Sequence, residues 1–155
     1  MTGKIEATLA RMDVTLFRPP APVANYVPYV LSGKLLFVSG QVCYTPDGSL
    51  IAKGKLGADV TLERGVLAAR QCAINLLMVA RLALGELDAI ARVIRLGGFV
   101  NSDPGFEQGP TVLNGASDLM VATFGEAGRH ARTTVGVAAL PGAAAVEVEA
   151  VFEVR

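Results

Sequence analysis

The sequence predicts an α+β fold in which two long helices cover one face of a mixed, mostly antiparallel sheet. Two segments carry apolar residues at helical spacing, and several others alternate apolar and polar residues as strands do. Their order is strands, helix, strand, helix, strands, which favours a sheet with its helices on one side. At 155 residues the chain is long enough for one domain with a substantial core.

We divide this single domain (residues 1–155) into an N-terminal extension, residues 1–25, and a core, residues 26–155. Apolar residues at helical spacing predict a short helix over residues 2–11. Three prolines within residues 19–22 then force an extended segment, because proline fixes φ and restricts the residue before it.

The core begins with two strands, predicted over residues 27–31 and 35–39, which flank a turn at Gly33. A long helix follows over residues 59–84, where apolar side chains form one stripe. Gly85 comes directly after this stripe and suits the end of a helix.

The next two elements are a strand over residues 89–101 and a helix over residues 110–124. Gly97 and Gly98 fall inside the strand and predict either a bulge or a close approach of another group to the backbone.

Two strands at the end of the chain are predicted to form a hairpin, over residues 131–139 and 146–154. In the second strand, valine, alanine and phenylalanine alternate with Glu147, Glu149 and Glu153, so only one face suits the core. A shift of one residue would bury the glutamates, which fixes the register.

Composition and charge limit the classes of function. The 14 basic and 14 acidic residues balance, and no basic tract is present, so we expect no nucleic-acid partner. Charged residues interrupt every apolar run, so we expect no membrane span, and the N-terminus lacks the apolar core of a signal peptide. These features favour a cytoplasmic protein.

The two cysteines share no spacing typical of a metal or redox site. Cys72 falls in an apolar helical pattern and is predicted to lie in the core, whereas Cys43 suits either the core or the edge of a cleft. With one histidine, the chain suggests no metal site and no obvious nucleophile–histidine pair.

Four segments in order resemble the RidA family, also called YjgF or UK114. Residues 37–41 (Phe-Val-Ser-Gly-Gln) resemble the family's apolar-Ser-Gly-Gln segment, and residues 98–106 resemble its central strand and the following loop. Residues 112–114 (Val-Leu-Asn) resemble a helix start. Residues 131–150, with an Arg, Leu-Pro and Val-Glu-Val-Glu-Ala, resemble the C-terminal signature. The resemblance covers residues 26–155 and implies a chorismate-mutase-like fold and a homotrimer with clefts between subunits.

Two charged residues are the catalytic candidates. The resemblance implies that Arg132 holds the substrate carboxylate, as in the deaminating members, and that Glu147 positions water. Guanidinium groups bind carboxylates through two parallel hydrogen bonds and stay charged. From position alone, Arg132 could instead pair with a glutamate across the hairpin, and Glu147 could lie on a solvated strand face.

Three further residues are candidates for substrate binding by the same resemblance. Tyr26 matches a cleft tyrosine, with Tyr29 as the alternative, and could equally be a half-buried ring. Asn114 matches a cleft asparagine but also suits a helix start. Gly40 could admit a ligand close to the backbone or simply end a strand.

The chain departs from the family pattern at two positions near Arg132. Thr134 stands where well-studied members carry a cysteine, although its backbone N–H can still bind a carboxylate oxygen. His130, two residues before Arg132, departs from the family's usual Phe-Pro in that place and could line the cleft or lie on the surface.

The predicted hairpin separates the two catalytic candidates. Seven or eight residues at ~3.3 Å each would place Arg132 more than about 20 Å from Glu147. A shared site would therefore need the two residues from different subunits.

These residues favour a 2-imino or enamino acid deaminase that forms a 2-oxo acid and ammonia without a cofactor or metal. The alternative is a non-catalytic trimer that binds small carboxylates or regulates another protein. Endoribonuclease or translation-inhibitor action is the third possibility, and the composition gives it no support.

Overall fold

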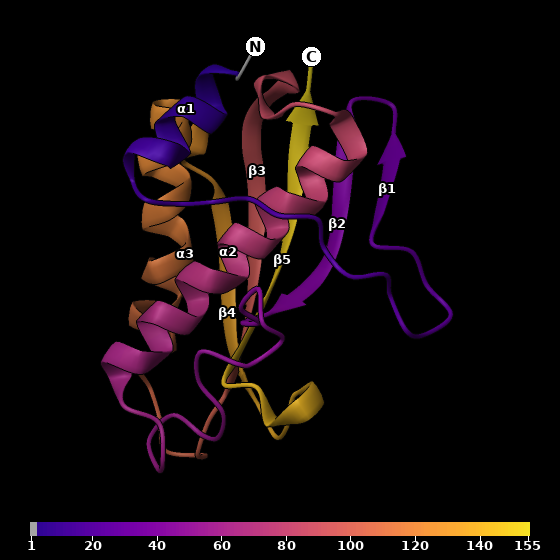
Figure 1. Ribbon diagram of the computed structural model, residues 1–155. Coiled ribbons are helices and arrows are strands. Elements are labelled where there is room, and N and C mark those ends of the chain that lie inside the picture. The colour runs from indigo at the N-terminus through magenta and orange to yellow at the C-terminus, as the bar shows by residue number, and fades with distance from the viewer. Residues whose placement is uncertain (1–2) are drawn as a thin grey trace.

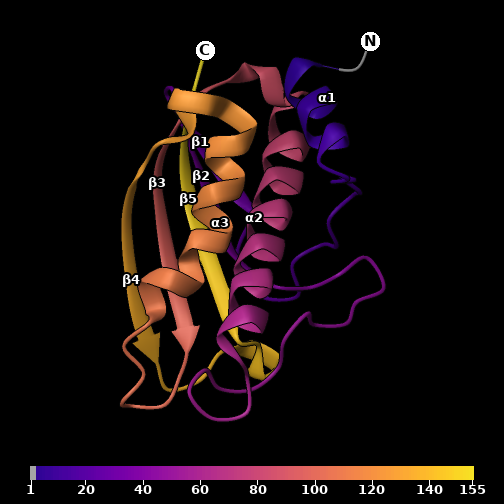
Figure 2. The same ribbon diagram turned by 90° about the vertical axis from the view of Figure 1, so that its left-hand side faces the viewer.

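The computed structural model describes residues 3–155 and contains a five-stranded sheet with two long helices on one face (Figure 1). Figure 2 shows both helices on the same side of the sheet. This architecture confirms the predicted α+β class. The elements are α1 (Lys4–Arg11), β1 (Tyr29–Ser32), β2 (Leu35–Val42), α2 (Leu62–Leu84), β3 (Ile90–Asn101), α3 (Gly109–Phe124), β4 (Ala131–Val137) and β5 (Val146–Val154), with 3₁₀ turns η1 (Leu87–Ala89), η2 (Gly125–Gly128) and η3 (Pro141–Ala143).

The strand order is β1-β2-β5-β3-β4, and the predicted C-terminal hairpin is wrong. β4 pairs with β3 in parallel, with Arg132 opposite Leu96, and β5 lies between β2 and β3, antiparallel to both. The physical reason is α3, which returns the chain from the end of β3 to the start of β4 and so makes those two strands parallel. β5, whose alternate side chains are buried, then fills the centre of the sheet.

Helix ends follow local capping. α2 begins three residues later than predicted because the Thr61 side chain accepts a hydrogen bond from the Arg64 N–H (3.2 Å) and caps the first turn. It ends at Gly85, as predicted, with φ of +82°. α1 matches the predicted helix over residues 2–11 from Lys4 onward, and residue 2 lies outside the described part of the chain.

α2 is long and apolar enough to cross a membrane, so the expectation that charged residues interrupt every apolar run is wrong for this helix. In the structure, however, α2 is a core helix. Within its most apolar stretch, 61% of the residues are buried inside the domain. They lie against the sheet and α3 (Figure 2). Its hydropathy is therefore explained by packing within the domain.

Both cysteines are completely buried. The Cys72 thiol donates to the Val146 carbonyl oxygen (3.4 Å), as expected for a core residue. The Cys43 thiol donates to the Ala52 carbonyl oxygen (3.5 Å), so this residue also belongs to the core rather than to a cleft.

Close backbone approaches explain two predicted glycines. A Cβ at Gly98 would collide with the side chain of Leu113 in α3, and one at Gly97 would lie 2.6 Å from the Glu149 carboxylate. The bulges in β3 lie elsewhere, between Ile90 and Arg95. Of the two predicted alternatives, the close approach is therefore correct.

Helices α2 and α3 touch at Gly115, and this contact predicts a strong mutational effect. A Cβ there would overlap the Val66 carbonyl group of α2, which cannot rotate away as a side chain can. We expect Gly115→Ala to destabilise the protein by about 2–3 kcal/mol, and to lower Tm by roughly 6 °C, in thermal unfolding. Gly105→Ala is the control, because a Cβ there meets no atom within 4 Å; equal effects of both changes would contradict this packing argument.

The N-terminal helix is anchored by an acidic residue 84 positions along the chain. The Asp88 carboxylate accepts hydrogen bonds from the backbone N–H groups of Lys4 (2.7 Å) and Ile5 (2.8 Å). These bonds lower the pKa of Asp88. The anchoring is therefore complete above the ordinary carboxylate pKa and is lost as the pH falls through the lowered pKa of Asp88.

Asp88→Ala should loosen this anchor. We expect amide exchange in the first turn of α1 to become roughly five times faster, the usual effect of losing an N-cap. Hydrogen-exchange mass spectrometry at neutral pH measures this. Glu86→Ala, a nearby change that removes no cap, should leave the exchange unchanged.

Candidate functional site

The structure gathers the predicted site residues into two groups. Arg132, Thr134 and Asn114 lie between β4 and α3, and with Ser117 they form what we name the arginine cluster. Tyr26, Gly40 and Glu147 line one pocket, which we name the glutamate pocket.

The Arg132 guanidinium is held entirely by neutral groups. Its Nη1 donates to Asn114 Oδ1 (2.8 Å) and Ser117 Oγ (3.2 Å), and its Nη2 donates to the Pro110 carbonyl oxygen (3.2 Å). Within residues 3–155, no carboxylate lies within 4.0 Å of it. The alternative of an ion pair across a hairpin is therefore wrong.

The three bonds leave two donors of Arg132 free. A guanidinium has five N–H groups, and Nε–H and one Nη2–H have no acceptor among residues 3–155. Two donors on one planar group match the number that a carboxylate engages in a bidentate pair. The group is thus held in position, charged and able to receive an anion.

One stripe of α3 supplies all three acceptors. Pro110, Asn114 and Ser117 are spaced i, i+4 and i+7, so they lie on the same side of the helix and face β4. Since α3 begins at Gly109, Asn114 lies in the second turn, and its alternative role at the helix start is wrong.

Thr134 lies two residues after Arg132 and therefore on the same face of β4. Its hydroxyl is buried and has no hydrogen-bond partner among the described residues. Most buried hydroxyl groups find a partner, so this one marks a polar position next to Arg132 that is still unsatisfied.

His130 and Ser117 form a hydrogen-bonded pair that the sequence analysis did not predict. His130 Nδ1 lies 2.6 Å from the Gly128 carbonyl oxygen, and Nε2 lies 2.9 Å from Ser117 Oγ. A carbonyl can only accept, so Nδ1 carries the proton, and Nε2 of the neutral ring accepts from the Ser117 hydroxyl. Burial lowers the pKa of His130, the bond to Gly128 opposes this, and the Arg132 charge lowers the pKa further. The statement that the chain has no nucleophile–histidine pair is therefore wrong.

The glutamate pocket has a volume of about 340 Å³ and lies beside the proline-rich segment of the extension. Tyr26, rather than Tyr29 of β1, lines it. Gly40 lies at an irregularity of β2, and a Cβ there would collide with the Glu147 carboxylate. Burial raises the pKa of Glu147, and the charge of Glu149 adds to the effect. A raised pKa suits a carboxylate that both accepts and returns a proton near neutral pH.

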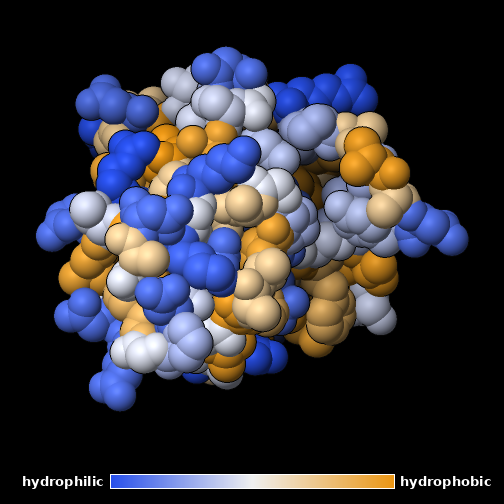
Figure 3. Space-filling view, turned by 90° about the horizontal axis from the view of Figure 1, so that it is seen from below, coloured by the Kyte–Doolittle hydropathy of each residue, from blue (hydrophilic) through white to orange (hydrophobic). Residues whose placement is uncertain are grey.

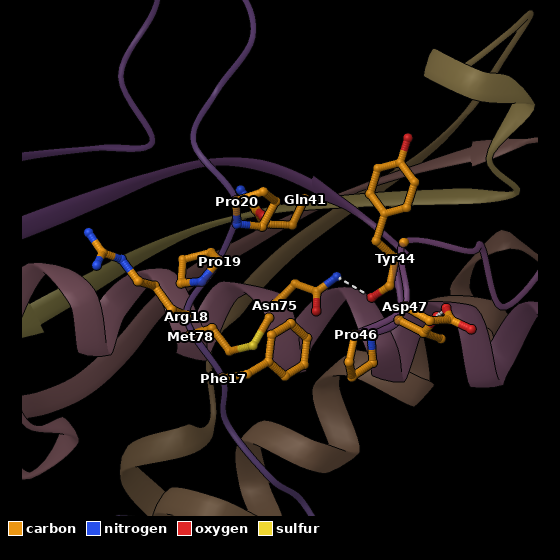
Figure 4. Close-up of a pocket in the computed structure, with 12 residues that line it drawn as sticks. Phe17, Arg18, Pro19, Pro20, Gln41, Tyr44, Pro46, Asp47, Asn75 and Met78 are labelled. Carbon is orange, nitrogen blue, oxygen red and sulfur yellow. Dashed lines mark hydrogen bonds between the residues drawn. The ribbon is translucent and has the colours of Figure 1, made fainter.

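A larger pocket of about 570 Å³ adjoins the glutamate pocket and shares Pro19, Pro20, Gln41 and Tyr44 with it. In Figure 4 the Phe17 ring and the Met78 side chain lie together on one wall. The Asn75 amide of α2 donates to the Val42 (2.8 Å) and Tyr44 (3.0 Å) carbonyl oxygens and fixes the end of β2. Seen from below, the surface has a hollow to the right of its centre (Figure 3). The extension therefore forms a wall of both pockets.

The two groups lie on opposite faces of the sheet within one chain. Arg132 reaches α3 on the helix face, whereas Glu147 alternates with the buried residues of β5 and so points to the uncovered face. Arg132 lies level with Leu96 and Glu147 with Phe99, two strands apart, so their backbones are about 14 Å apart rather than more than 20 Å. Arg132 and Glu147 of one chain are therefore still separated, but because they lie on opposite faces of the sheet and not because they lie at opposite ends of a hairpin.

Comparisons with known proteins agree with this architecture. A family model described as "YjgF/chorismate mutase-like, putative endoribonuclease" matches residues 6–152. Protein TCP17 of Trypanosoma cruzi is 47% identical over 155 residues, covering 99% of this chain and 96% of that protein. The crystal structure of Atu1372 from Agrobacterium tumefaciens, of unknown function, is 44% identical with a TM-score of 0.90, covering 97% of this chain and 94% of that one. A "putative endoribonuclease" structure from Shewanella oneidensis is 35% identical with a TM-score of 0.93, covering 98% and 100%.

Proposed function

Because this chain belongs to the YjgF/chorismate-mutase-like family, we propose that it is a 2-imino acid deaminase, which hydrolyses reactive imines to 2-oxo acids and ammonia. The observation that carries the proposal is the state of Arg132. Its guanidinium is fixed by three neutral acceptors, has no carboxylate neighbour in residues 3–155 and keeps two donors free. A 2-imino acid offers the carboxylate that such a group binds.

The reaction needs one proton acceptor and one anchor. Arg132 and the Thr134 N–H hold the carboxylate, and Glu147 takes a proton from water as its oxygen attacks the imine carbon. Glu147 then returns that proton to the imine nitrogen, which gives a carbinolamine. Glu147 next takes the hydroxyl proton of this intermediate and passes it to the amino group, so that the C–N bond breaks, the C=O bond forms and ammonia leaves. The imine carbon is already electrophilic, so positioning and proton transfer are sufficient and no cofactor is required.

The same proposal requires a homotrimer, with Arg132 and Glu147 of adjacent subunits meeting in each cleft. Its support is the uncovered sheet face, where apolar side chains are exposed to solvent in one chain. The side chains of Phe37 and Val135 are each 44% exposed and that of Val30 is 51% exposed. Exposed apolar patches of this kind mark surfaces that associate. Light scattering should give three times the mass of one chain.

Turnover of an imine generated in solution tests the activity. A threonine dehydratase supplies 2-iminobutanoate, and the rate at which 2-oxobutanoate forms is compared with and without this protein. We expect clear acceleration over spontaneous hydrolysis. No acceleration by a properly assembled trimer would reject 2-iminobutanoate as a substrate.

The second candidate is a cytoplasmic trimer that binds small carboxylates without turning them over. The observation that favours it is the Ser117–His130 pair beside Arg132, because His130 departs from the pattern of the family that this chain resembles. A pure binder would bind 2-oxobutanoate and leave imine hydrolysis unchanged. Ribonuclease action, the description carried by some relatives, predicts salt-sensitive RNA binding and ranks third because the net charge is zero.

A further inference from the structure

A continuous chain of hydrogen bonds leads from Arg132 Nη1 through Ser117 and His130 to the backbone of η2. Arg132 Nη1 donates to Ser117 Oγ (3.2 Å), Ser117 Oγ donates to His130 Nε2 (2.9 Å), and Nδ1 donates to the Gly128 carbonyl oxygen (2.6 Å). These three hydrogen bonds can all form at once only while the imidazole is neutral, because Nε2 must then accept from Ser117. Neutral His130 thus fixes the direction of the Ser117 hydroxyl, with its oxygen toward Arg132.

Protonation of His130 would reverse part of this chain. Nε2 would then carry a hydrogen and donate it to Ser117 Oγ, which would accept from two cations at once. Through Ser117, the imidazolium and the guanidinium would be no more than about 6 Å apart, a distance at which like charges oppose each other strongly inside a protein. An anion bound to Arg132 offsets this repulsion.

We propose that Ser117 and His130 are positioning residues for Arg132, and that they link carboxylate binding at Arg132 to proton uptake by His130. The proposal rests on the part of the proposed function in which Arg132 binds a carboxylate, and it does not depend on imine turnover. By thermodynamic reciprocity, an anion that favours the imidazolium must itself bind more tightly as the pH falls through the titration of His130.

The other charged groups around His130 do not explain such a link. Charged residues next to this segment are Asp118, which follows Ser117 on α3, the exposed Arg129–Glu126 pair at η2, Arg92 of β3, which donates to the Arg129 carbonyl oxygen, and Arg95, which lies opposite Ala131. Of the charged neighbours, Arg132 is the one that contributes to the lowered pKa of His130. The link should therefore run through Arg132 and Ser117.

NMR titration of the imidazole tests the proposal in the assembled protein, because His130 is the only histidine of the chain. The probe is 2-oxobutanoate, which stays a monoanion across the titration. We expect saturating 2-oxobutanoate to raise the pKa of His130 by about one unit. Calorimetry should show several-fold tighter binding at about pH 5.5 than at about pH 8, with a matching uptake of protons.

Three variants distinguish the coupling of carboxylate binding to His130 protonation from a general change in the structure of the site. His130→Gln keeps an acceptor for Ser117 but cannot titrate, so its affinity for 2-oxobutanoate should be the same at about pH 5.5 as at about pH 8. Ser117→Ala removes one support of Arg132 and should weaken binding several-fold at both pH values. Asp118→Asn, a matched change of one charge beside Ser117, should preserve the pH dependence.

The outcomes distinguish this inference from the proposed function. If 2-oxobutanoate binds through Arg132 while the pKa of His130 stays constant, or if His130→Gln keeps the acid-dependent gain, the inference is wrong and the deaminase proposal stands. If the pKa of His130 responds but imines are not hydrolysed, the inference stands and the chain is a binder. If calorimetry detects no binding of 2-oxobutanoate at tens of millimolar, the inference is wrong, and the rate of imine hydrolysis alone decides the deaminase proposal.

Discussion

Arg132→Ala should remove the acceleration of imine hydrolysis almost completely. The change deletes both free donors and the positive charge, which in the proposed mechanism pair with the substrate carboxylate through two charge-assisted hydrogen bonds. We expect kcat/KM to fall by roughly 100- to 1000-fold, the loss of two strong hydrogen bonds. The measurement is the coupled dehydratase assay with wild type and variant at equal protein concentration.

Two further variants sharpen this result. Arg132→Lys keeps the charge but loses the two parallel N–H donors of the guanidinium, so its activity should fall between that of the wild type and that of Arg132→Ala. Arg129→Ala is the matched control, because Arg129 lies three residues earlier and pairs with the exposed Glu126. A normal rate for Arg132→Ala, with circular dichroism unchanged, would mean that another group holds the carboxylate.

Glu147→Gln should also be inactive, and mixing it with Arg132→Ala should restore activity. The amide cannot take the proton from water, so we expect kcat to fall by roughly 100-fold or more. In a trimer built from equal amounts of the two variants, each site takes residue 132 from one subunit and residue 147 from its neighbour. A site has both native side chains when the first subunit is the Glu147→Gln variant and the second is the Arg132→Ala variant. Random mixing therefore predicts about a quarter of wild-type activity.

Unfolding and refolding the two variants together produces the mixed trimers, and native mass spectrometry of variants with different tags confirms them. Mixing Arg132→Ala with Arg132→Lys provides the control, since those chains cannot complement each other between subunits. Confirmed mixed trimers without restored activity would place Arg132 and Glu147 in separate functions.

The strands and helices were predictable because their signals are local. The apolar stripe of α2 and the alternation of β5 each depend on neighbours within one segment, and both segments fold as predicted. The pairing of β4 was not predictable from such signals. Alternation tells which face of a strand is buried but not which strand lies beside it, and the parallel pairing with β3 depends on the path of α3.

The candidate site divides in the same way. Arg132, Asn114 and Thr134 came from the resemblance and lie together, as do Tyr26, Gly40 and Glu147. Ser117 and His130 were missed as a pair. One is a small polar residue in an apolar helix and the other precedes a strand, and 13 residues separate them. The available signal was the spacing of Ser117 one turn after Asn114, together with the position of His130 two residues before Arg132.

The arginine cluster and the glutamate pocket are built by different segments of the chain, so the selectivity for the substrate side chain could change while carboxylate binding is kept. In the proposed function the carboxylate is held by α3 and β4, which pack against the rest of the core and tolerate little change. The extension forms one wall of the other half, and its proline-rich stretch is more exposed. Surface segments accept substitution more readily than the elements they connect. Relatives could therefore come to prefer substrates with other side chains by substitutions in the extension, while the same arginine continues to bind the carboxylate.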